Sequence, residues 1–533
     1  MSNFLNRFSD RVKRSRRGKI DSWDKKSISG SVHASVGARA PKTVRLMIND
    51  MSVLEVPVKV TDDGRLGFKI GMYDVWRFAA KNDRISVFFG DTALTFPDGK
   101  IFLNPDRNGK ESLDQLRQRF SYGQYFDKAG KIKVRKLTKD RDQIWQDGVM
   151  TLYAEVTDVI REVTGSDSFI FSGTLLGYVR DKGFIPHDKD MDCAYLSDKK
   201  TEVEVAEEFA ALGDALIAAG YCVTPKASCI SVRRSSGSNV MVDIAHLFIK
   251  SDGNVGFPFG RVGTDAVSVD VFLPVGSGAL SGYSVGIPAK PEELVKHIYG
   301  QDWQIPDPGF KWSERRQSRD PGPLLDYSQR TRIAMDDLYS RPEITEPSAF
   351  ALWIADHDSL PPIKEAFDLG CGNGRDLLTL RSVAERVTGI DRSPYAVSAA
   401  IQLTTGSSEI EVYQADLLQE GTLSSPEGDF ARLFYARLLL NGLTKSEQDT
   451  LFESLDAVMK PGDFLAFEHR TTKDEKLKKA RFRSFRRFVD TNDLLQRLNE
   501  LGLEIIHHEE GTGLAPFEHE DPHVVRIIAA MPK

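Results

Sequence analysis

The chain has 533 residues, of which 41% are hydrophobic, and a formal net charge of -6. This length predicts roughly three domains of ~100–200 residues each, and the acidic balance excludes a global attraction to nucleic acid. No apolar run reaches the ~18–20 residues that cross a bilayer. The 4 cysteines have no CxxC or Cys/His spacing, which excludes a zinc site of that type and indicates a reducing compartment. We expect a cytoplasmic globular protein without a signal peptide.

Residues 1–40 are predicted to form a basic, flexible arm. Its apolar residues recur at roughly helical spacing among Arg and Lys, so the arm is either a short amphipathic helix on anionic lipid or a disordered basic segment. The first alternative implies a peripheral position at the inner face of the cytoplasmic membrane. Within the arm, 27–37 is interpreted as a Ser/Gly-rich linker. From 41 to 110, alternating apolar residues broken by turn signals predict a small β domain without catalytic residues.

A helix predicted over 141–163 leads into residues 171–193, FSGTLLGYVRDKGFIPHDKDMDC, where a Ser-Gly turn precedes a group of carboxylates. Magnesium and manganese prefer hard oxygen ligands and bridge a few carboxylates to substrate phosphates. Asp190 and Asp192 are alternate residues, which face one way on a strand. This pair predicts a divalent-metal site that works on a phosphate-bearing substrate.

A third carboxylate is expected on a later strand. Asp243 interrupts the apolar run NVMVDIAHLFI, where an unpaired carboxylate would cost several kcal/mol, so we expect a metal or cation partner. Asp270, within VSVDVFLP, is the competing candidate. Asp188 is either part of the site or a solvated ion pair with Lys189.

The stretch SGTLLGYVRDKGFIPHDKDMD resembles the signature of the LicD family of phosphotransferases, which includes the fukutin-related enzymes. Asp243 resembles the family's downstream aspartate, and HIYGQDWQIPDP at 297–308 resembles its closing segment, so the resemblance covers about 152–312. His187 stands where the family often has Trp, and Lys189 replaces one acid. These departures concern the acceptor pocket more than the metal pair.

The resemblance implies a nucleotidyltransferase-like α+β fold and transfer of a phospho-alcohol from a CDP-activated donor to the hydroxyl of a glycan, free or lipid-linked. Asp190 and Asp192 would hold Mg²⁺ or Mn²⁺, and Asp243 would complete the metal site or accept the hydroxyl proton. Arg180 and Lys182 would stabilise charge on the transferring group.

After a predicted linker at 315–325 the pattern changes to α/β. AFDLG is a strand that ends at Asp368 and Gly370, followed by a Gly-rich turn and the helix-forming stretch DLLTLRSVAERV. A second strand, RVTGID, ends at Asp391, about 20 residues after the turn, which is the spacing expected where a ribose is held. The glycines alone could equally serve a nicotinamide cofactor.

The continuation is more specific, because DLGCGNG, TGIDRSPYAV and YQADL resemble motifs one to three of class I S-adenosylmethionine-dependent methyltransferases, over approximately 327–533. The resemblance implies a Rossmann-like doubly wound domain. Its two motif glycines would approach the methionine part of the cofactor, one aspartate would hold the ribose, and an Asp-Leu pair would frame the adenine. The implied cofactor site consists of Asp368, Gly370, Gly372, Asp391, Asp416 and Leu417.

Methylation of an alcohol also requires a base. Glu468 and His469, after the strand DFLAFEHR, are candidates, with a structural role as the alternative. The basic stretch 470–487 either grips a phosphate-bearing acceptor or is a solvated helical face.

Together the motifs predict an α/β multidomain chain with a basic arm (1–40), a β domain (41–110), a LicD-like domain (111–325) and a methyltransferase domain (326–533). We expect a bifunctional enzyme of bacterial surface-polysaccharide assembly, in a capsule, O-antigen or teichoic-type glycan. One hypothesis is that phosphotransfer creates the methyl acceptor. The alternatives for the first module are a nucleotidyltransferase that makes a CDP-alcohol and an inactive glycan-binding module that delivers the acceptor.

Overall fold

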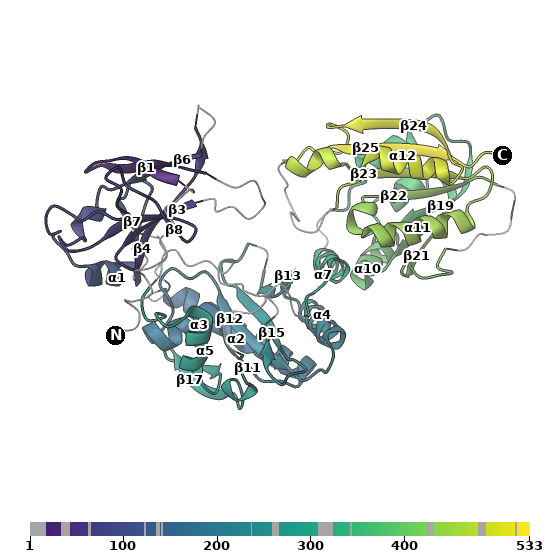
Figure 1. Cartoon of the computed structure of the whole chain (residues 1–533). Helices are drawn as coiled ribbons and strands as arrows, with labels where there is room; N and C mark the ends of the chain where they lie inside the picture. The colour runs from purple at the N-terminus through teal and green to yellow at the C-terminus, as the bar shows by residue number, and fades with distance from the viewer. Residues whose placement is uncertain are drawn as a thin grey trace. The chain divides into compact units, whose positions relative to one another are not determined.

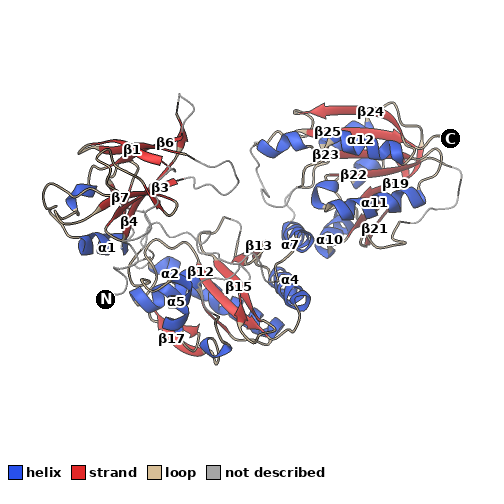
Figure 2. Cartoon of the chain, in the orientation of Figure 1, coloured by secondary structure: helices blue, strands red, loops and turns tan. Residues whose placement is uncertain are grey.

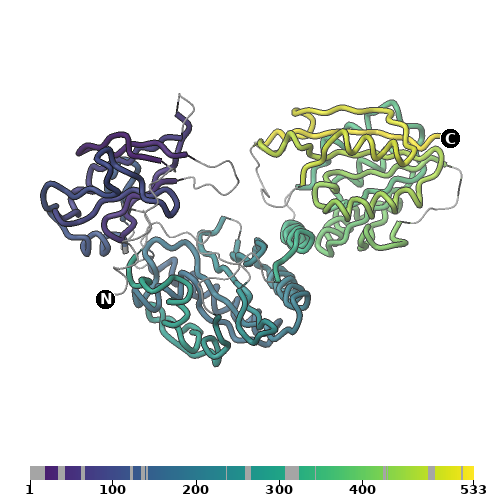
Figure 3. Tube along the Cα trace, viewed as in Figure 1, coloured from purple at the N-terminus to yellow at the C-terminus, as the bar shows by residue number. Residues whose placement is uncertain are grey.

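The chain was analysed as a computed structural model that describes residues 18–33, 43–61, 66–121, 124–134, 139, 142–235, 237–257, 266–306, 323–341, 344–423, 428, 430–477, 487–517 and 520–533. The predicted arm before residue 18, most of the linker at 315–325 and residues 478–486 of the basic stretch lie outside the described residues. The course of the chain can be followed by colour, from purple at the N-terminus to yellow at the C-terminus, in Figures 1 and 3. The chain divides into two compact units. The first unit comprises Met1–Asp158, Ser166–Asp198 and Asn239–Gly322, and the second comprises Val159–Gly165, Lys199–Ser238 and Pro323–Lys533.

The N-terminal part of the first unit is built from two small sheets of four strands each, drawn as red arrows in Figure 2. In spatial order, the first sheet consists of β1 (Gly18–Trp23), β2 (Ser27–Val32), β6 (Leu66–Gly71) and β5 (Lys59–Val60). The second consists of β4 (Met51–Pro57), β3 (Thr43–Ile48), β7 (Ile85–Phe89) and β8 (Thr92–Ala93). The predicted β architecture of this region is confirmed.

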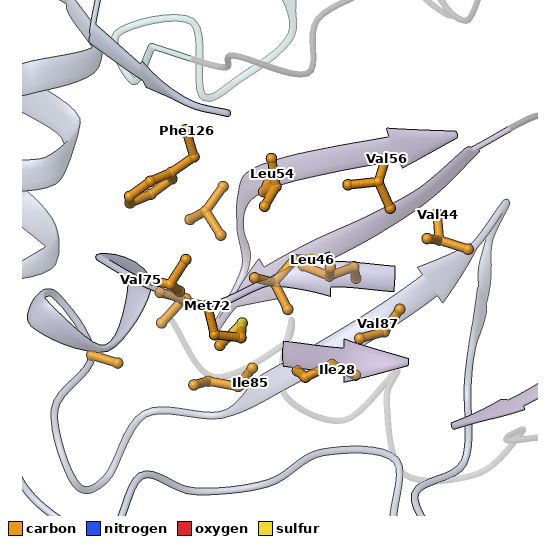
Figure 4. Packing of buried hydrophobic residues seen from close by; sticks show 14 of the residues in the cluster. Ile28, Val44, Leu46, Leu54, Val56, Met72, Val75, Ile85, Val87 and Phe126 are labelled. Atoms are coloured by element: carbon orange, nitrogen blue, oxygen red, sulfur yellow. The ribbon is translucent and has the colours of Figure 1, made fainter. Parts of the chain in front are cut away.

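Side chains from both sheets meet in one apolar core, together with Phe126 from the strand β9 (Gln124–Phe126) (Figure 4). Further elements of this region are η2 (Val75–Arg77), α1 (Leu113–Ser121) and β10 (Ile132–Val134). The strands alternate buried and half-buried positions, as in β3 and β7, which is the period of a sheet with one covered face.

The prediction of a linker at 27–37 is wrong for the residues of β2, and the prediction of a flexible arm at 1–40 is wrong for the residues of β1. β2 pairs with both β1 and β6 and buries Ile28, Gly30 and Val32. A Cβ at Gly30 would lie 2.3 Å from the carbonyl oxygen of Lys19, so this glycine permits close strand contact. The Ser/Gly composition that indicated a linker therefore serves a tightly packed strand.

The central part of the chain begins with the long helix α2 (Gln143–Thr164), close to the predicted bounds. The strands β11 (Ser168–Ile170) and β12 (Met191–Ser197) pair antiparallel, and β12 runs parallel to β15 (Val242–Ile249), which also pairs with β16 (Val255–Gly256). The remaining elements of the first unit here are α3 (Ser172–Leu176), η3 (Gly177–Asp181), η4 (Val269–Val271), β17 (Gly276–Leu280), β18 (Tyr283–Ile287) and α5 (Pro291–Tyr299).

The second unit includes α4 (Glu202–Ala218) and the hairpin of β13 (Cys222–Pro225) and β14 (Ile230–Arg233). The helix α7 (Tyr327–Tyr339) packs against α4, β13 and α10 (Pro394–Leu403). Capping boxes fix the starts of α4 and α7, at Thr201 with Glu204 and at Asp326 with Gln329.

A seven-stranded sheet forms the rest of the second unit, in the order β21-β20-β19-β22-β23-β25-β24. The first five strands are parallel and the last two pair antiparallel. The strands are β19 (Ile363–Leu369), β20 (Ala384–Asp391), β21 (Ile410–Gln414), β22 (Arg432–Arg437), β23 (Phe464–Arg470), β24 (Glu504–Gly511) and β25 (Val524–Ala530). The helices are α8 (Ala349–Ala355), α9 (Leu377–Leu380), η5 (Leu440–Gly442), α11 (Lys445–Val458), η6 (Thr472–Lys476) and α12 (Thr491–Glu500).

This sheet confirms the predicted doubly wound fold. Five parallel strands place their carboxyl ends at one edge, where such folds bind ligands. None of the described helices is both long enough and apolar enough to cross a membrane.

Candidate functional sites

The first candidate site is a group of carboxylates at one end of β12 and β15. Asp192 and Asp243 are directly opposite each other in the parallel register. Asp190 directly precedes β12. The prediction that Asp190 and Asp192 lie on one strand is therefore wrong for Asp190. Asp188 lies in the same preceding loop.

The Ser-Gly turn holds this group in place. The backbone N–H of Gly173 donates to Oδ2 of Asp192 (2.9 Å), and the Asp192 N–H donates to Oγ1 of Thr174 (2.8 Å). A Cβ at Gly173 would lie 3.1 Å from Oδ2 of Asp192 and 3.3 Å from Oδ2 of Asp188. Glycine at this position therefore leaves room for two carboxylates on the same side of the turn.

The electrostatics indicate accumulated negative charge. Burial and the neighbouring Asp190 raise the pKa of Asp188 to about 7. Burial, then the charges of Asp188, Asp190 and Asp243, raise the pKa of Asp192 well above its ordinary value. Carboxylates held close together in this way favour the binding of either a proton or a cation, which reduces their mutual repulsion. The structure thus adds Asp188 to the three predicted carboxylates.

The oxygen-only donor set has the chemistry that Mg²⁺ and Mn²⁺ prefer. Among the described residues, no three or more His, Cys, Asp or Glu side chains are arranged so that they could hold a metal ion. The competing candidate Asp270 is exposed and forms an ion pair with Lys290, whereas Asp243 faces Asp192.

Arg180 and Lys182, the two predicted cations, belong to the segment of η3 that follows the Ser-Gly turn. Arg180 donates to Asp181 at 2.8 Å, and Lys182 is exposed and ends η3 with a left-handed φ of 56°. Sequence reasoning did not single out Tyr299, at the end of α5. Burial and the charges of Asp192 and Asp188 raise its pKa, which places this phenol near the carboxylates. The segment HIYGQDW was the signal that could have found it.

The second candidate site is a cavity of about 340 Å³ at the carboxyl edge of the seven-stranded sheet. Side chains from α7, from the glycine-rich turn and from the ends of four parallel strands line it. They include Asp336, Tyr339, Gly370, Asn373, Arg375, Asp391, Asp416, Leu417, Arg437, Asn441 and Arg470.

The glycine-rich turn is fixed by Asp391 at the end of β20. Its Oδ2 accepts from the N–H of Gly372 and its Oδ1 from that of Ser393, both at 2.9 Å. Gly370 and Gly372 have φ of 74° and 55°, which glycine adopts without strain. Asp416 similarly accepts from the N–H of Leu418 at 3.0 Å.

Four of the predicted cofactor residues, Gly370, Asp391, Asp416 and Leu417, line the described cavity. Asp368 is only 2% exposed, and burial raises its pKa, followed by the charge of Asp376. Asp368 is not among the described residues that line the cavity.

The base candidates are buried. His469 is 0% exposed, and burial lowers its pKa to about 3. Glu468 forms ion pairs with Arg526 at 2.9 Å and Arg437 at 3.2 Å. Neither is among the described residues that line the cavity.

Two family models match the chain. The model of the LicD/FKTN/FKRP nucleotidyltransferase domain matches residues 165–290, and that of a methyltransferase domain matches residues 366–462. The chain joins a LicD domain to a methyltransferase domain. It is therefore an enzyme of the transferase class, with the carboxylate group in the LicD domain and the glycine-rich turn in the methyltransferase domain.

Among solved structures, a SAM-dependent methyltransferase from Anabaena variabilis ATCC 29413 is 16% identical, with a TM-score of 0.30, and the alignment covers 38% of this chain and 92% of that one. N-methyltransferase NodS from Bradyrhizobium japonicum WM9 is 18% identical, with a TM-score of 0.28, over 35% of this chain and 94% of that one. No curated protein matches the chain significantly.

Proposed function

We propose that the chain is a bifunctional transferase of bacterial surface-polysaccharide assembly. Its LicD domain transfers a phospho-alcohol from a CDP-activated donor to a glycan hydroxyl, and its methyltransferase domain methylates the product or the glycan with S-adenosylmethionine. The observation that carries the first activity is the gathering of Asp188, Asp190, Asp192 and Asp243, whose mutual charges act on Asp188 and Asp192.

In this proposal Asp190, Asp192 and Asp243 would hold Mg²⁺ or Mn²⁺, and the ion would neutralise the donor diphosphate and the leaving nucleotide. Gly173 fixes Asp192 through its N–H, which orients one carboxylate before substrate arrives. Arg180 and Lys182 would meet the phosphate of the transferring group. Asp243 would complete the metal site or accept the proton of the attacking hydroxyl.

For methyl transfer, we propose that S-adenosylmethionine lies in the cavity at the sheet edge. Asp391 would bind the ribose hydroxyls, and Asp416 with Leu417 would frame the adenine. The support is positional, because these residues follow β20 and β21, next to the glycine-rich turn after β19. Proximity and in-line alignment then supply much of the rate of methyl transfer.

The phosphotransfer proposal is tested by the nucleotide that the enzyme releases. With Mg²⁺ or Mn²⁺, a panel of CDP-alcohols and a glycan acceptor, cytidine monophosphate is the expected product. Asp192→Asn should lower its release at least about 100-fold, because loss of even an outer-shell partner commonly costs 10–100-fold. Asp270→Asn is the matched control and should keep full activity.

Two results would contradict the proposal. Release of pyrophosphate from cytidine triphosphate would identify a nucleotidyltransferase that makes a CDP-alcohol. Equal activity and metal binding in Asp192→Asn and the wild type would favour the inactive glycan-binding module.

We also propose that the basic segment before Gly18 contacts anionic lipid, which would bring the enzyme to a lipid-linked acceptor. Sedimentation with anionic liposomes should fall when residues 1–17 are removed, a deletion that leaves β1 in place. Unchanged sedimentation would contradict the membrane contact.

A further inference from the structure

The cavity of the methyltransferase domain is electrically polarised along the sheet edge. The strand order β21-β20-β19-β22-β23 places Asp416 and Asp391 at one end of the row. Arg437 and Arg470 are the last residues of β22 and β23, on the other side of β19. Asp336, Arg332 and Arg392 also line the cavity, so the end after β21 and β20 holds carboxylates together with arginines, whereas the end after β22 and β23 is basic.

Two of the basic residues already have carboxylate partners. Arg470 forms ion pairs with Asp474 at 3.1 Å and with Glu520. Arg437 forms one with Glu468 at 3.2 Å, but that carboxylate also accepts from Arg526 at 2.9 Å. Arg437 thus shares the Glu468 carboxylate with a second arginine, and the charge of Asp376 also favours its cation.

Arg375, directly after the glycine-rich turn, has less compensation. Its side chain is 20% exposed, and its Nε lies 4.0 Å from Oδ1 of Asp376. That oxygen accepts from the N–H of Ser348 (2.7 Å), and Oδ2 accepts from the hydroxyls of Ser348 (2.8 Å) and Tyr435 (2.9 Å). Within the described part of the chain, the buried Nε of Arg375 has no hydrogen-bond partner.

Arg375 and Arg437 also repel each other. Burial, then the charge of Arg437, lowers the pKa of Arg375. The side chains of Arg375 and Arg437 are 20% and 25% exposed, and two half-buried guanidinium groups on one cavity wall are costly unless an anion joins them. A guanidinium binds phosphate or carboxylate through parallel N–H···O bonds, so an oxyanion is the ligand chemistry that fits both groups.

We propose that Arg375 and Arg437 bind an anionic oxygen group, a phosphate or a carboxylate, on the methyl acceptor. This inference rests on the proposed S-adenosylmethionine site and names the class of acceptor for it. The donor occupies the end of the cavity after β20 and β21, and the acceptor oxyanion occupies the basic end.

The chemistry of such an acceptor fits the residues present. An anionic oxygen attacks the methyl carbon, an O–C bond forms, and the C–S bond breaks with its electron pair going to sulfur. The products are a methyl ester and neutral S-adenosylhomocysteine, and no proton has to move. A base is therefore unnecessary, which agrees with the burial of His469 away from the described cavity wall.

The carboxylate of the cofactor's own methionine has the same oxyanion chemistry, so the test must separate it from an acceptor. Isothermal titration calorimetry on the full chain measures S-adenosylhomocysteine binding first. Inorganic phosphate and acetate are then titrated separately into the protein saturated with S-adenosylhomocysteine. The variant is Arg375→Gln, and the control is Arg381→Gln, a half-buried arginine outside the described cavity lining that donates to the carbonyl oxygen of Ala384 at 3.0 Å and pairs with Glu409 at 4.0 Å.

We expect the saturated wild type to bind at least one of the two anions, and the anion that binds identifies the source. Arg375→Gln should weaken that binding about tenfold or more, keep S-adenosylhomocysteine affinity within about twofold, and melt at the wild-type temperature. Arg381→Gln should behave as the wild type in all three measurements.

Three outcomes would overturn the inference. One is that neither anion binds the saturated wild type, and another is that Arg375→Gln binds the anion as well as the wild type. The third is that Arg375→Gln loses S-adenosylhomocysteine affinity about tenfold with anion binding unchanged, which would assign Arg375 to the cofactor carboxylate. Failure of the wild type to bind S-adenosylhomocysteine would instead overturn the proposed methyltransferase site itself.

Discussion

At the scale of single residues, His469 makes the fold sensitive to acid. The imidazole is fully buried at the end of β23, packs edge-to-face on Phe467 with ring centroids 5.1 Å apart, and has its pKa lowered to about 3. In the unfolded chain a histidine titrates near ~6.5. Between these values the unfolded chain binds a proton that the folded chain does not, so the free energy of unfolding falls as pH falls below about 6.5.

We predict that urea midpoints of the wild type decrease steadily from pH 7 to pH 5, and that His469→Leu lacks this part of the decrease. His508→Gln, at an exposed position, is the control and should keep the wild-type pH dependence. Identical slopes in His469→Leu and the wild type would show that another group controls the acid response.

Gly372 is a second residue-scale test. Its φ is 55°, and a Cβ there would lie 2.5 Å from the hydroxyl oxygen of Tyr339. Gly372→Ala should therefore lower the free energy of unfolding by about 1–3 kcal/mol and displace Tyr339 from the cavity wall. S-adenosylhomocysteine affinity, measured by calorimetry, should fall with it.

The control is Gly406→Ala, where φ is also positive (95°) but no atom lies within 4 Å of the added Cβ. It should show the backbone strain without the clash and retain cofactor affinity. Equal losses in the two variants would attribute the effect to backbone conformation alone.

The sequence predicted residues whose identity is dictated by chemistry, such as the Asp192 and Asp243 carboxylates, which the structure places opposite each other. It left the role of Asp188 open and did not single out Arg375. The surroundings of these side chains depend on chain segments that are distant in sequence. For example, the counter-charge of Arg437 is shared with Arg526 only because β23 pairs with β25.

At the scale of elements, α7 is the helix on which the methyltransferase cavity depends most. Thr331, Met335 and Tyr339 line the cavity, whereas Asp337 accepts from the N–H of Val223 on β13 at 2.6 Å. Ile333 is fully buried, and its Cδ1 would be 3.2 Å from a Cβ at Gly213 on α4. The same helix therefore packs on α4 and β13 and forms a cavity wall.

We predict that Ile333→Ala lowers the free energy of unfolding by about 2–4 kcal/mol and also weakens S-adenosylhomocysteine binding, because α7 loses its packing on α4. Leu352→Ala, at a side chain that is 48% exposed on α8, should change both quantities little. Denaturant titration and calorimetry provide the two measurements. Unchanged cofactor affinity in a destabilised Ile333→Ala would separate the helix packing from the cavity.

One predicted element was wrong for a reason of packing. DLLTLRSVAERV reads as a helix, but α9 spans only Leu377–Leu380, and β20 begins at Ala384, opposite Ile363 of β19. A short apolar run is compatible with the helical period and with a buried strand. Here the run forms a strand because it pairs with the parallel strand β19. The doubly wound sheet itself was predictable, because the strand patterns AFDLG and RVTGID are apolar and end at Gly370 and Asp391.

At the scale of the whole molecule, the two domains carry chemistries that can follow one another. The LicD domain is proposed to install a phosphate-linked group, and the basic end of the methyltransferase cavity is proposed to bind an oxyanion. If that oxyanion is the phosphate just installed, Asp192→Asn abolishes methylation of the glycan while leaving S-adenosylhomocysteine binding intact. This hypothesis depends on the order of the two reactions and on no particular arrangement of the two units.

The most direct test is mass spectrometry of a surface-glycan acceptor incubated with the enzyme, Mg²⁺ or Mn²⁺, a panel of CDP-alcohols and S-adenosylmethionine, with one donor omitted at a time. We predict a phospho-alcohol adduct without S-adenosylmethionine, and a methyl group that is gained only when a CDP-alcohol is also present. Methylation of the glycan with every CDP-alcohol inert would contradict the account of two successive transfers.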